Sequence, residues 1–193
     1  MWTMDEVRAS EANLAREVPK DSTLKVINLV GGPGAGKSTI ALGLGYLMKL
    51  DGLNVELARE YAKKLVYEDN LKTLANQDYV FAKQLKKLRD LVGEVDYAIT
   101  DSPLLLSQLY NKDQEDIIFK SYIQARYDGF NNVMVWVNRP EKYQVEGRLH
   151  NKEQAKRIDT VLKPMIKPDL EIDATPDAHL RLLNILKERR FII

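Results

Sequence analysis

The segment GGPGAGKST, residues 31–39, has the residue types and spacing of a loop that binds phosphate. Gly31, Gly36, Lys37 and Ser38 satisfy the pattern G-x-x-x-x-G-K-[ST]. Glycines let the backbone N–H groups turn toward phosphate oxygens, and the N-terminus of a following helix adds partial positive charge. We expect Lys37 to contact the β- and γ-phosphates and Ser38 to bind Mg²⁺. The residues expected to bind the nucleotide are Gly31, Gly32, Pro33, Gly34, Ala35, Gly36, Lys37, Ser38 and Thr39.

Two questions about this loop stay open at the level of the sequence. A turn that only connects a strand to a helix would explain the glycines, but it would not explain Lys37 and Ser38 at this spacing. We therefore expect a nucleoside triphosphate, with ATP as the cofactor, although the loop itself does not distinguish ATP from GTP.

Asp101 is the expected second ligand of Mg²⁺. A phosphate loop of this kind needs a carboxylate at the end of a neighbouring apolar strand, and Asp101 directly follows the apolar run 95–100. Asp96 is the competing acid, but it lies at the start of that run. The alternative role of Asp101 is a helix cap or an Asx turn in front of Pro103.

Arg59 and Glu60 follow another apolar run, residues 54–58. A kinase needs a carboxylate to orient or deprotonate the acceptor hydroxyl and a cation to hold the acceptor. We expect Glu60 and Arg59 to fill these roles, which makes both of them substrate-binding. The alternative is an exposed, charged helix start in which Glu60 pairs with Lys64.

The region 139–160 has the composition of a lid. It carries Arg148 and Arg157, and a lid of this kind excludes water and brings guanidinium charge to the transferring phosphoryl group. The predicted catalytic residues are therefore Lys37, Glu60, Asp101, Arg148 and Arg157. His150 and His179 have no ligand cluster around them, so no zinc site is expected.

The elements that must position these residues alternate along the chain. Apolar runs at 24–30, 54–58, 95–100, 131–138 and 168–173 predict strands, and the segments 38–50, 59–67 and 74–92 and the C-terminal end predict helices. Strands separated by helices favour an α/β fold: three layers, with a parallel, five-stranded sheet and helices on both faces. Ligands bind beyond the carboxyl ends of such strands.

Length and composition indicate one domain over residues 1–193, with a helical extension at 1–22. The chain has no cysteine and no apolar run long enough for a membrane span, and its N-terminus does not have the pattern of a signal peptide. We therefore expect a cytoplasmic protein without a membrane partner. The net charge of +1 does not predict nucleic-acid binding, and the oligomeric state stays open.

With these motifs in order, the chain resembles the small P-loop kinases grouped with the nicotinamide-riboside kinase domain and its viral AAA-ATPase-like relatives. The resemblance spans residues 24–190 and is carried by the phosphate loop, ELAREY (56–61), ANQDYVFAKQ (75–84), AITDSPLLLSQ (98–108) and EGRLHNKEQAKRID (146–159). It implies ATP and Mg²⁺ as cofactors and a small hydroxyl acceptor. The apolar stretch after Asp101 leaves the acceptor open between a nucleoside, a nucleotide and DNA.

Some viral members of this group act on hydroxymethylated pyrimidines in DNA. The resemblance therefore adds such DNA bases to the candidate acceptors of this chain. The basic clusters 83–89 and 152–157 would then line one face. Tyr61, Tyr67, Tyr79 and Phe81 would be candidates to stack on an extruded base, whereas core packing is the alternative and the preferred one for Phe81. A P-loop ATPase that acts as a switch or motor on a protein or nucleic-acid partner is the rival function. The third hypothesis is a nucleotide-binding module without catalytic activity.

Overall fold

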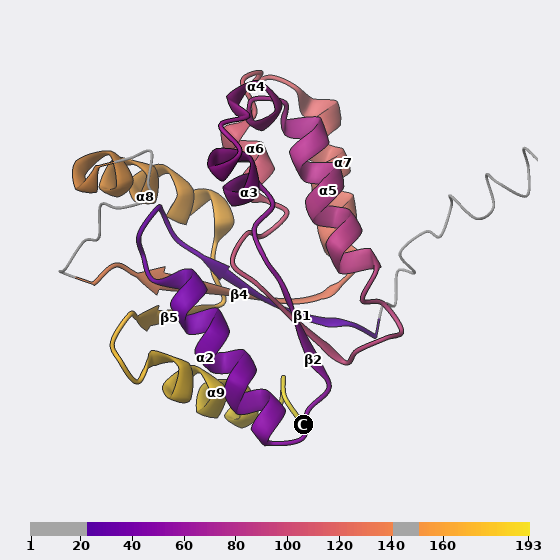
Figure 1. The fold of residues 1–193 in the computed structure, drawn as a ribbon, viewed down its shortest axis with the longest axis vertical. Helices are drawn as coiled ribbons and strands as arrows, with labels where there is room; N and C mark the ends of the chain where they lie inside the picture. The colour runs from indigo at the N-terminus through magenta and orange to yellow at the C-terminus, as the bar shows by residue number, and fades with distance from the viewer. Residues whose placement is uncertain (1–22, 141–150) are drawn as a thin grey trace, which may run out of the picture.

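The computed structural model describes residues 23–140 and 151–193 (Figure 1). It contains one parallel sheet in the order β2-β3-β1-β4-β5. The predicted α/β fold with five parallel strands is confirmed. The strands are β1 (Lys25–Val30), β2 (Val55–Ala58), β3 (Tyr97–Thr100), β4 (Asn131–Asn138) and β5 (Leu170–Asp173).

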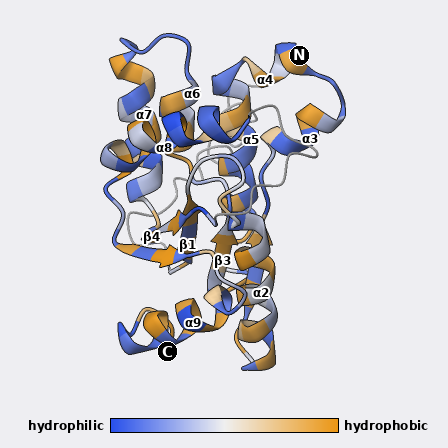
Figure 2. Ribbon diagram, turned by 90° about the vertical axis from the view of Figure 1, so that its left-hand side faces the viewer, coloured by the Kyte–Doolittle hydropathy of each residue, from blue (hydrophilic) through white to orange (hydrophobic). Residues whose placement is uncertain are grey.

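The central strand β1 is buried on both faces because helices cover both sides of the sheet. Ile27 pairs in register with Ile99 of β3 and with Val133 of β4. Along β1, Ile27 and Leu29 contribute to one core cluster and Val26 to the other, as the two-residue period of a strand requires. Figure 2 shows the hydrophobic colour running through the strands, whereas α2 carries both colours.

Two helical layers enclose the sheet. The helices α2 (Lys37–Leu50) and α9 (Ala178–Glu188) cover one face, and α5 (Gln77–Arg89), α7 (Ile117–Asp128) and α8 (Lys152–Ile166) cover the other. Three shorter helices complete the described part of the chain: α3 (Ala62–Tyr67), α4 (Leu71–Leu74) and α6 (Leu106–Tyr110). Since α3 follows β2 and α6 follows β3, both lie near the carboxyl edge of the sheet, where ligands bind in such folds.

Several predicted boundaries differ from the structure. The helix expected over 59–67 begins only at Ala62, which leaves Arg59 and Glu60 in the connection from β2. The helix expected over 74–92 is α5, and it begins at Gln77 because the side chain of Asn76 accepts a hydrogen bond from the Tyr79 N–H and caps it. The helices α6 and α7 have no counterpart in the prediction.

Two further expectations concern segments that the structure does not describe. The helical extension at 1–22 lies outside the described residues, and so do residues 141–150 of the predicted lid, which include Arg148. The described part of that lid forms the start of α8. Among the described helices, none is long and apolar enough to cross a bilayer.

Candidate functional site

The phosphate loop connects β1 to α2 at the carboxyl edge of the sheet. Gly36 stands at the helix N-cap with φ 97°, a left-handed conformation that favours glycine. Gly32 is required for a different reason: a Cβ there would lie 2.9 Å from the carbonyl oxygen of Ala155 in α8. The loop therefore closes under α8 in a form that larger side chains at these two positions would not permit.

Lys37 folds back over this loop. Its ammonium group donates hydrogen bonds to the carbonyl oxygens of Gly31 at 2.7 Å and Gly32 at 3.2 Å. Burial lowers the pKa of Lys37, while the carboxylates of Glu60, Asp101 and Asp159 act in the opposite direction. The ammonium group is thus held inside the loop near three acidic side chains. It can contact a phosphate that binds in the loop.

Asp101 joins the phosphate loop to the connection after β2. Its Oδ2 accepts a 2.5 Å hydrogen bond from the Ser38 hydroxyl, and its Oδ1 accepts a 3.0 Å hydrogen bond from the backbone N–H of Glu60. Asp101 is buried. The cap of α6 is Leu105, so the alternative role of Asp101 as a helix cap is wrong.

Ser38 and Asp101 form an oxygen donor set of the kind that Mg²⁺ prefers. The described residues contain no group of three or more His, Cys, Asp or Glu side chains that would hold a metal ion by themselves. A magnesium ion at this point would therefore need phosphate oxygens and water as its remaining ligands, which is the usual arrangement for Mg²⁺ bound with a nucleotide.

Glu60 faces the same centre. Burial raises the pKa of its carboxyl group, the Lys37 ammonium opposes this shift, and the Asp101 carboxylate adds to it. Lys64 pairs with Glu68 at 3.6 Å. The alternative pairing of Glu60 with Lys64 is therefore not found, and the Glu60 carboxylate lies on the side of the phosphate loop.

Gln84 of α5, to which the sequence analysis assigned no role, holds the segment that carries Glu60. Its amide oxygen accepts a 3.1 Å hydrogen bond from the Tyr61 N–H, and its NH₂ group donates to the carbonyl of Ala58 and the hydroxyl of Thr100 at 3.3 Å each. The side chain is buried. The sequence did contain a signal for this role: Gln84 lies among apolar residues of the helix. A buried polar side chain needs hydrogen-bond partners, so such a position indicates a structural contact.

An ion pair between Arg139 and Asp159, two residues of the predicted lid region, also holds the phosphate loop. The Asp159 carboxylate accepts a 2.6 Å hydrogen bond from the Gly32 N–H and pairs with the Arg139 guanidinium at 2.7 Å. Arg139 also donates to the carbonyl oxygen of Pro33. Only 8% of the Arg139 side chain and 20% of the Asp159 side chain are exposed. This pair links α8, which begins in the predicted lid, to the phosphate loop.

Tyr110, the last residue of α6, is a further residue to which the sequence analysis assigned no role. Burial, and then the negative charges of Glu60 and Asp159, raise its pKa to about 12. Its phenol is therefore within electrostatic reach of both carboxylates from the end of α6. Nothing in the sequence around Tyr110 indicated that it lies near the site, because the helix that positions it was not predicted.

Three further predicted residues form no side-chain hydrogen bond or ion pair with this centre within the part of the chain that the structure describes. Thr39, Arg59 and Arg157 are exposed. The Arg59 carbonyl accepts a 2.7 Å hydrogen bond from Lys87, and the Arg157 carbonyl accepts one from Thr160. Of the four aromatic candidates, Phe81 is buried in the core, whereas Tyr67 and Tyr79 are exposed and Tyr61 is half-buried. The preferred core role of Phe81 is thus confirmed.

Comparisons with known proteins agree with this architecture. A family model described as an AAA domain matches residues 26–172. No curated protein gives a significant match. A thymidylate kinase from Ehrlichia chaffeensis has a similar structure, with a TM-score of 0.55, 19% identity, and coverage of 84% of this chain and 98% of that one. A shikimate kinase from Acinetobacter baumannii, in complex with shikimate, has a TM-score of 0.52 and 14% identity, with coverage of 90% and 97%.

Proposed function

Because the chain belongs to this family of AAA domains, we propose that it is an ATP- and Mg²⁺-dependent kinase. It transfers the γ-phosphate to a hydroxyl group of a nucleoside, a nucleotide or a hydroxymethylated pyrimidine in DNA. The observation that carries the proposal is the position of Glu60, whose carboxylate and the Lys37 ammonium lie close enough to shift each other's pKa. A site that only binds a nucleotide does not need another carboxylate, in addition to Asp101, beside Lys37.

In this proposal the phosphate loop and Lys37 hold the triphosphate. The ammonium group now bonded to the carbonyls of Gly31 and Gly32 is a flexible donor that exchanges these contacts for phosphate oxygens. Ser38 and Asp101 hold Mg²⁺, which supplies positive charge to the phosphate oxygens when it is bound. Since the two side chains are already in contact, little rearrangement of the chain is needed.

Glu60 acts on the acceptor. A carboxylate whose pKa is raised by burial is a better proton acceptor than an exposed one, and it lies next to the point where the γ-phosphate is held. It orients the acceptor hydroxyl and takes up its proton as the oxygen bonds to phosphorus and the bond to ADP breaks. Arg148 and Arg157 of the lid supply guanidinium charge to the transferring group in this proposal.

The two proteins of similar fold are named as kinases, and the proposal agrees with their names. The resemblance to nicotinamide-riboside kinase domains and viral AAA-ATPase-like proteins adds nucleosides and modified DNA bases to the expected acceptors.

The test is transfer of label from γ-labelled ATP with Mg²⁺. The acceptors are nucleosides, nucleoside monophosphates, nicotinamide riboside, and DNA with or without hydroxymethylated pyrimidines. We expect label on one acceptor, its loss in Glu60→Gln with ATP binding retained, and full activity in Glu56→Gln, a matched exposed glutamate on β2. Release of free phosphate alone, undiminished in Glu60→Gln, would refute the kinase and favour an ATPase switch.

A further inference from the structure

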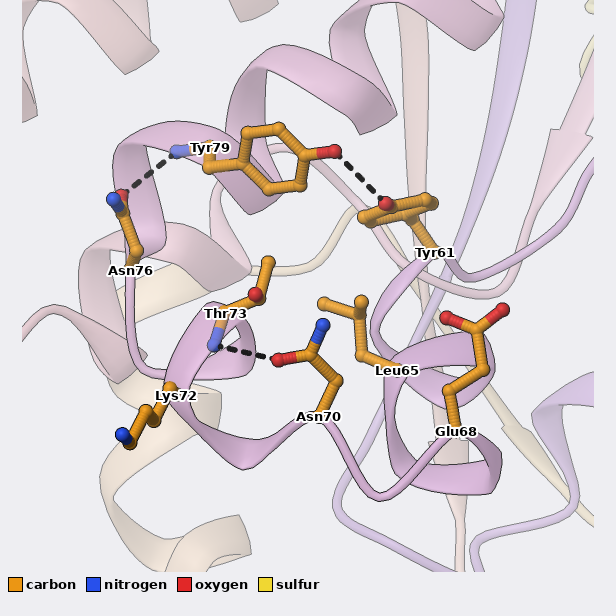
Figure 3. Close-up of a pocket in the computed structure, with 8 residues that line it drawn as sticks. All are labelled: Tyr61, Leu65, Glu68, Asn70, Lys72, Thr73, Asn76 and Tyr79. Atoms are coloured by element: carbon orange, nitrogen blue, oxygen red, sulfur yellow. Dashed lines mark hydrogen bonds between the residues drawn. The ribbon is translucent and has the colours of Figure 1, made fainter.

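A pocket opens directly beside the residue that acts on the acceptor. It lies between α3, α4 and the start of α5 and has a volume of about 530 Å³ (Figure 3). One of its lining residues is Tyr61, the chain neighbour of Glu60. Cavities of a few hundred Å³ hold small organic ligands. The residues that line it are Tyr61, Leu65, Glu68, Asn70, Lys72, Thr73, Asn76 and Tyr79.

Two aromatic rings form one side of this pocket. The rings of Tyr61 and Tyr79 meet edge to face with centroids 5.9 Å apart, and their hydroxyl groups lie 3.3 Å from each other. Tyr79 is 38% exposed, unlike Phe81, which is buried two positions along the same helix. Exposed tyrosines at a pocket provide flat surfaces on which a nucleobase can stack.

The opposite side is polar. The Asn70 and Asn76 oxygens cap α4 and α5 by accepting from the backbone N–H groups of Thr73 and Tyr79, as the dashed lines in Figure 3 show. The NH₂ group of each asparagine donates no hydrogen bond among the described residues. These groups are suited to the carbonyl oxygens of a heterocycle.

Two lysines that lie outside the lining of the pocket contact its tyrosine rings. The Lys83 ammonium lies 5.2 Å from the Tyr79 ring centroid, and the Lys87 ammonium lies 5.7 Å from that of Tyr61. Neither lysine forms an ion pair within the described part of the chain. Residues 59–90 contain eight Lys or Arg against five Asp or Glu, a net charge of +3, whereas the whole chain carries +1. The segment that lines the pocket and carries both lysines is therefore net positive.

Lys87 connects the pocket to the reacting centre. Its ammonium donates a 2.7 Å hydrogen bond to the Arg59 carbonyl and is close enough to Asp101 and Glu60 to be affected by both carboxylates. The side chain is only partly exposed. A half-buried cation with no carboxylate bonded to it is stabilised by an anionic ligand more than a fully hydrated surface lysine would be.

We propose that this pocket binds an acceptor that carries both a nucleobase and a phosphate, with the base against Tyr61 and Tyr79 and the phosphate bonded to Lys83 and Lys87. The inference rests on the proposed function and narrows its acceptor to phosphate-bearing molecules. Free nucleotides and single-stranded nucleic acid share this chemistry, and a neutral nucleoside lacks it.

The experiment compares deoxynucleosides, their 5′-monophosphates and short single-stranded oligonucleotides of the same bases, including hydroxymethylated pyrimidines. We expect Lys87→Gln to raise the KM for phosphate-bearing acceptors at least ten-fold, with little change in the KM for ATP. Lys87→Arg should restore binding because the charge is kept. Lys86→Gln is the matched control, since Lys86 is exposed on the same helix and pairs with Asp90.

Binding is also measured directly by titration of the monophosphates and oligonucleotides without ATP, so that the pocket is tested even if no transfer occurs. Weaker binding in Lys87→Gln and in Tyr79→Leu, together with preference for monophosphates or for oligonucleotides, supports the proposal and identifies the source of the phosphate. Nucleosides bound as tightly as their monophosphates, or binding unchanged in Lys87→Gln, would overturn it. Phosphate release without a labelled acceptor would instead refute the kinase activity.

Discussion

The hydroxyl of Ser38 lies 2.5 Å from Oδ2 of Asp101, a contact that joins the first turn of α2 to the end of β3. The two residues are far apart in the sequence, and they meet because β1 and β3 are parallel neighbours whose carboxyl ends share one edge. Oδ1 of the same carboxylate accepts from the Glu60 N–H, which brings the connection after β2 to this edge. One side chain therefore aligns the nucleotide side and the acceptor side of the site.

Asp101→Asn should reduce phosphoryl transfer about 10²-fold or more, because it removes a charge from the proposed Mg²⁺ site. The Mg²⁺ concentration for half-maximal activity should rise as well. Steady-state rates over a range of Mg²⁺ concentrations measure both effects. Asp96→Asn, which changes the exposed acid at the other end of the strand, is the control. Equal losses in the two variants would show that Asp101 has no special role.

Gln84→Ala should lower kcat while leaving the KM for ATP nearly unchanged, because the amide positions the Glu60 segment and does not contact the phosphate loop. The lost hydrogen bonds should also cost about 1–3 kcal/mol of stability. Gln77→Ala is the matched control, since Gln77 is buried on the same helix but bonds only to the Leu74 carbonyl. If both variants lose kcat equally, the effect is one of stability alone.

Asp159→Asn should destabilise the fold by about 2–3 kcal/mol, because it removes the negative charge that pairs with the mostly buried Arg139 guanidinium at 2.7 Å. Urea unfolding measures the change. The exposed pair of Lys163 with Glu171 provides a comparison, and Glu171→Gln should cost less than about 1 kcal/mol. A double-mutant cycle with Arg139→Met would give a coupling energy near zero if the two side chains do not act together.

Gly45→Ala should stabilise the protein by about 0.4–1 kcal/mol, because alanine restricts the unfolded chain and favours the helix. A Cβ at this position would meet Leu57 at 3.5 Å, an ordinary contact. Gly43→Ala on the same helix should gain nothing or destabilise, because its Cβ would lie 2.7 Å from the His179 ring. Thermal unfolding of both variants distinguishes them, and an equal gain in Tm would contradict the packing argument.

The sheet and the phosphate loop were predictable because their signals are local. The apolar run at 131–138 coincides with β4, and the helix that follows the loop begins at Lys37. The helices α6 and α7 were missed, since α6 is only five residues long and α7 buries few of its residues and has a weak apolar period. The predicted helix start at residue 59 was wrong because the Glu60 N–H donates to Asp101 and the Tyr61 N–H donates to Gln84, so neither group is available for a helix that begins earlier.

The sequence by itself determined the fold class, the nucleotide-binding loop and the positions at which strands end, because strand periodicity and the spacing of Gly36, Lys37 and Ser38 are properties of contiguous residues. Tertiary structure alone decided which polar groups meet. The contacts of Asp159 with Gly32, of Gln84 with Tyr61 and of Lys87 with Arg59 join segments whose relative placement depends on strand order and helix packing. The largely buried Asp159 carboxylate gains most from this placement, since the same charge in water would be screened.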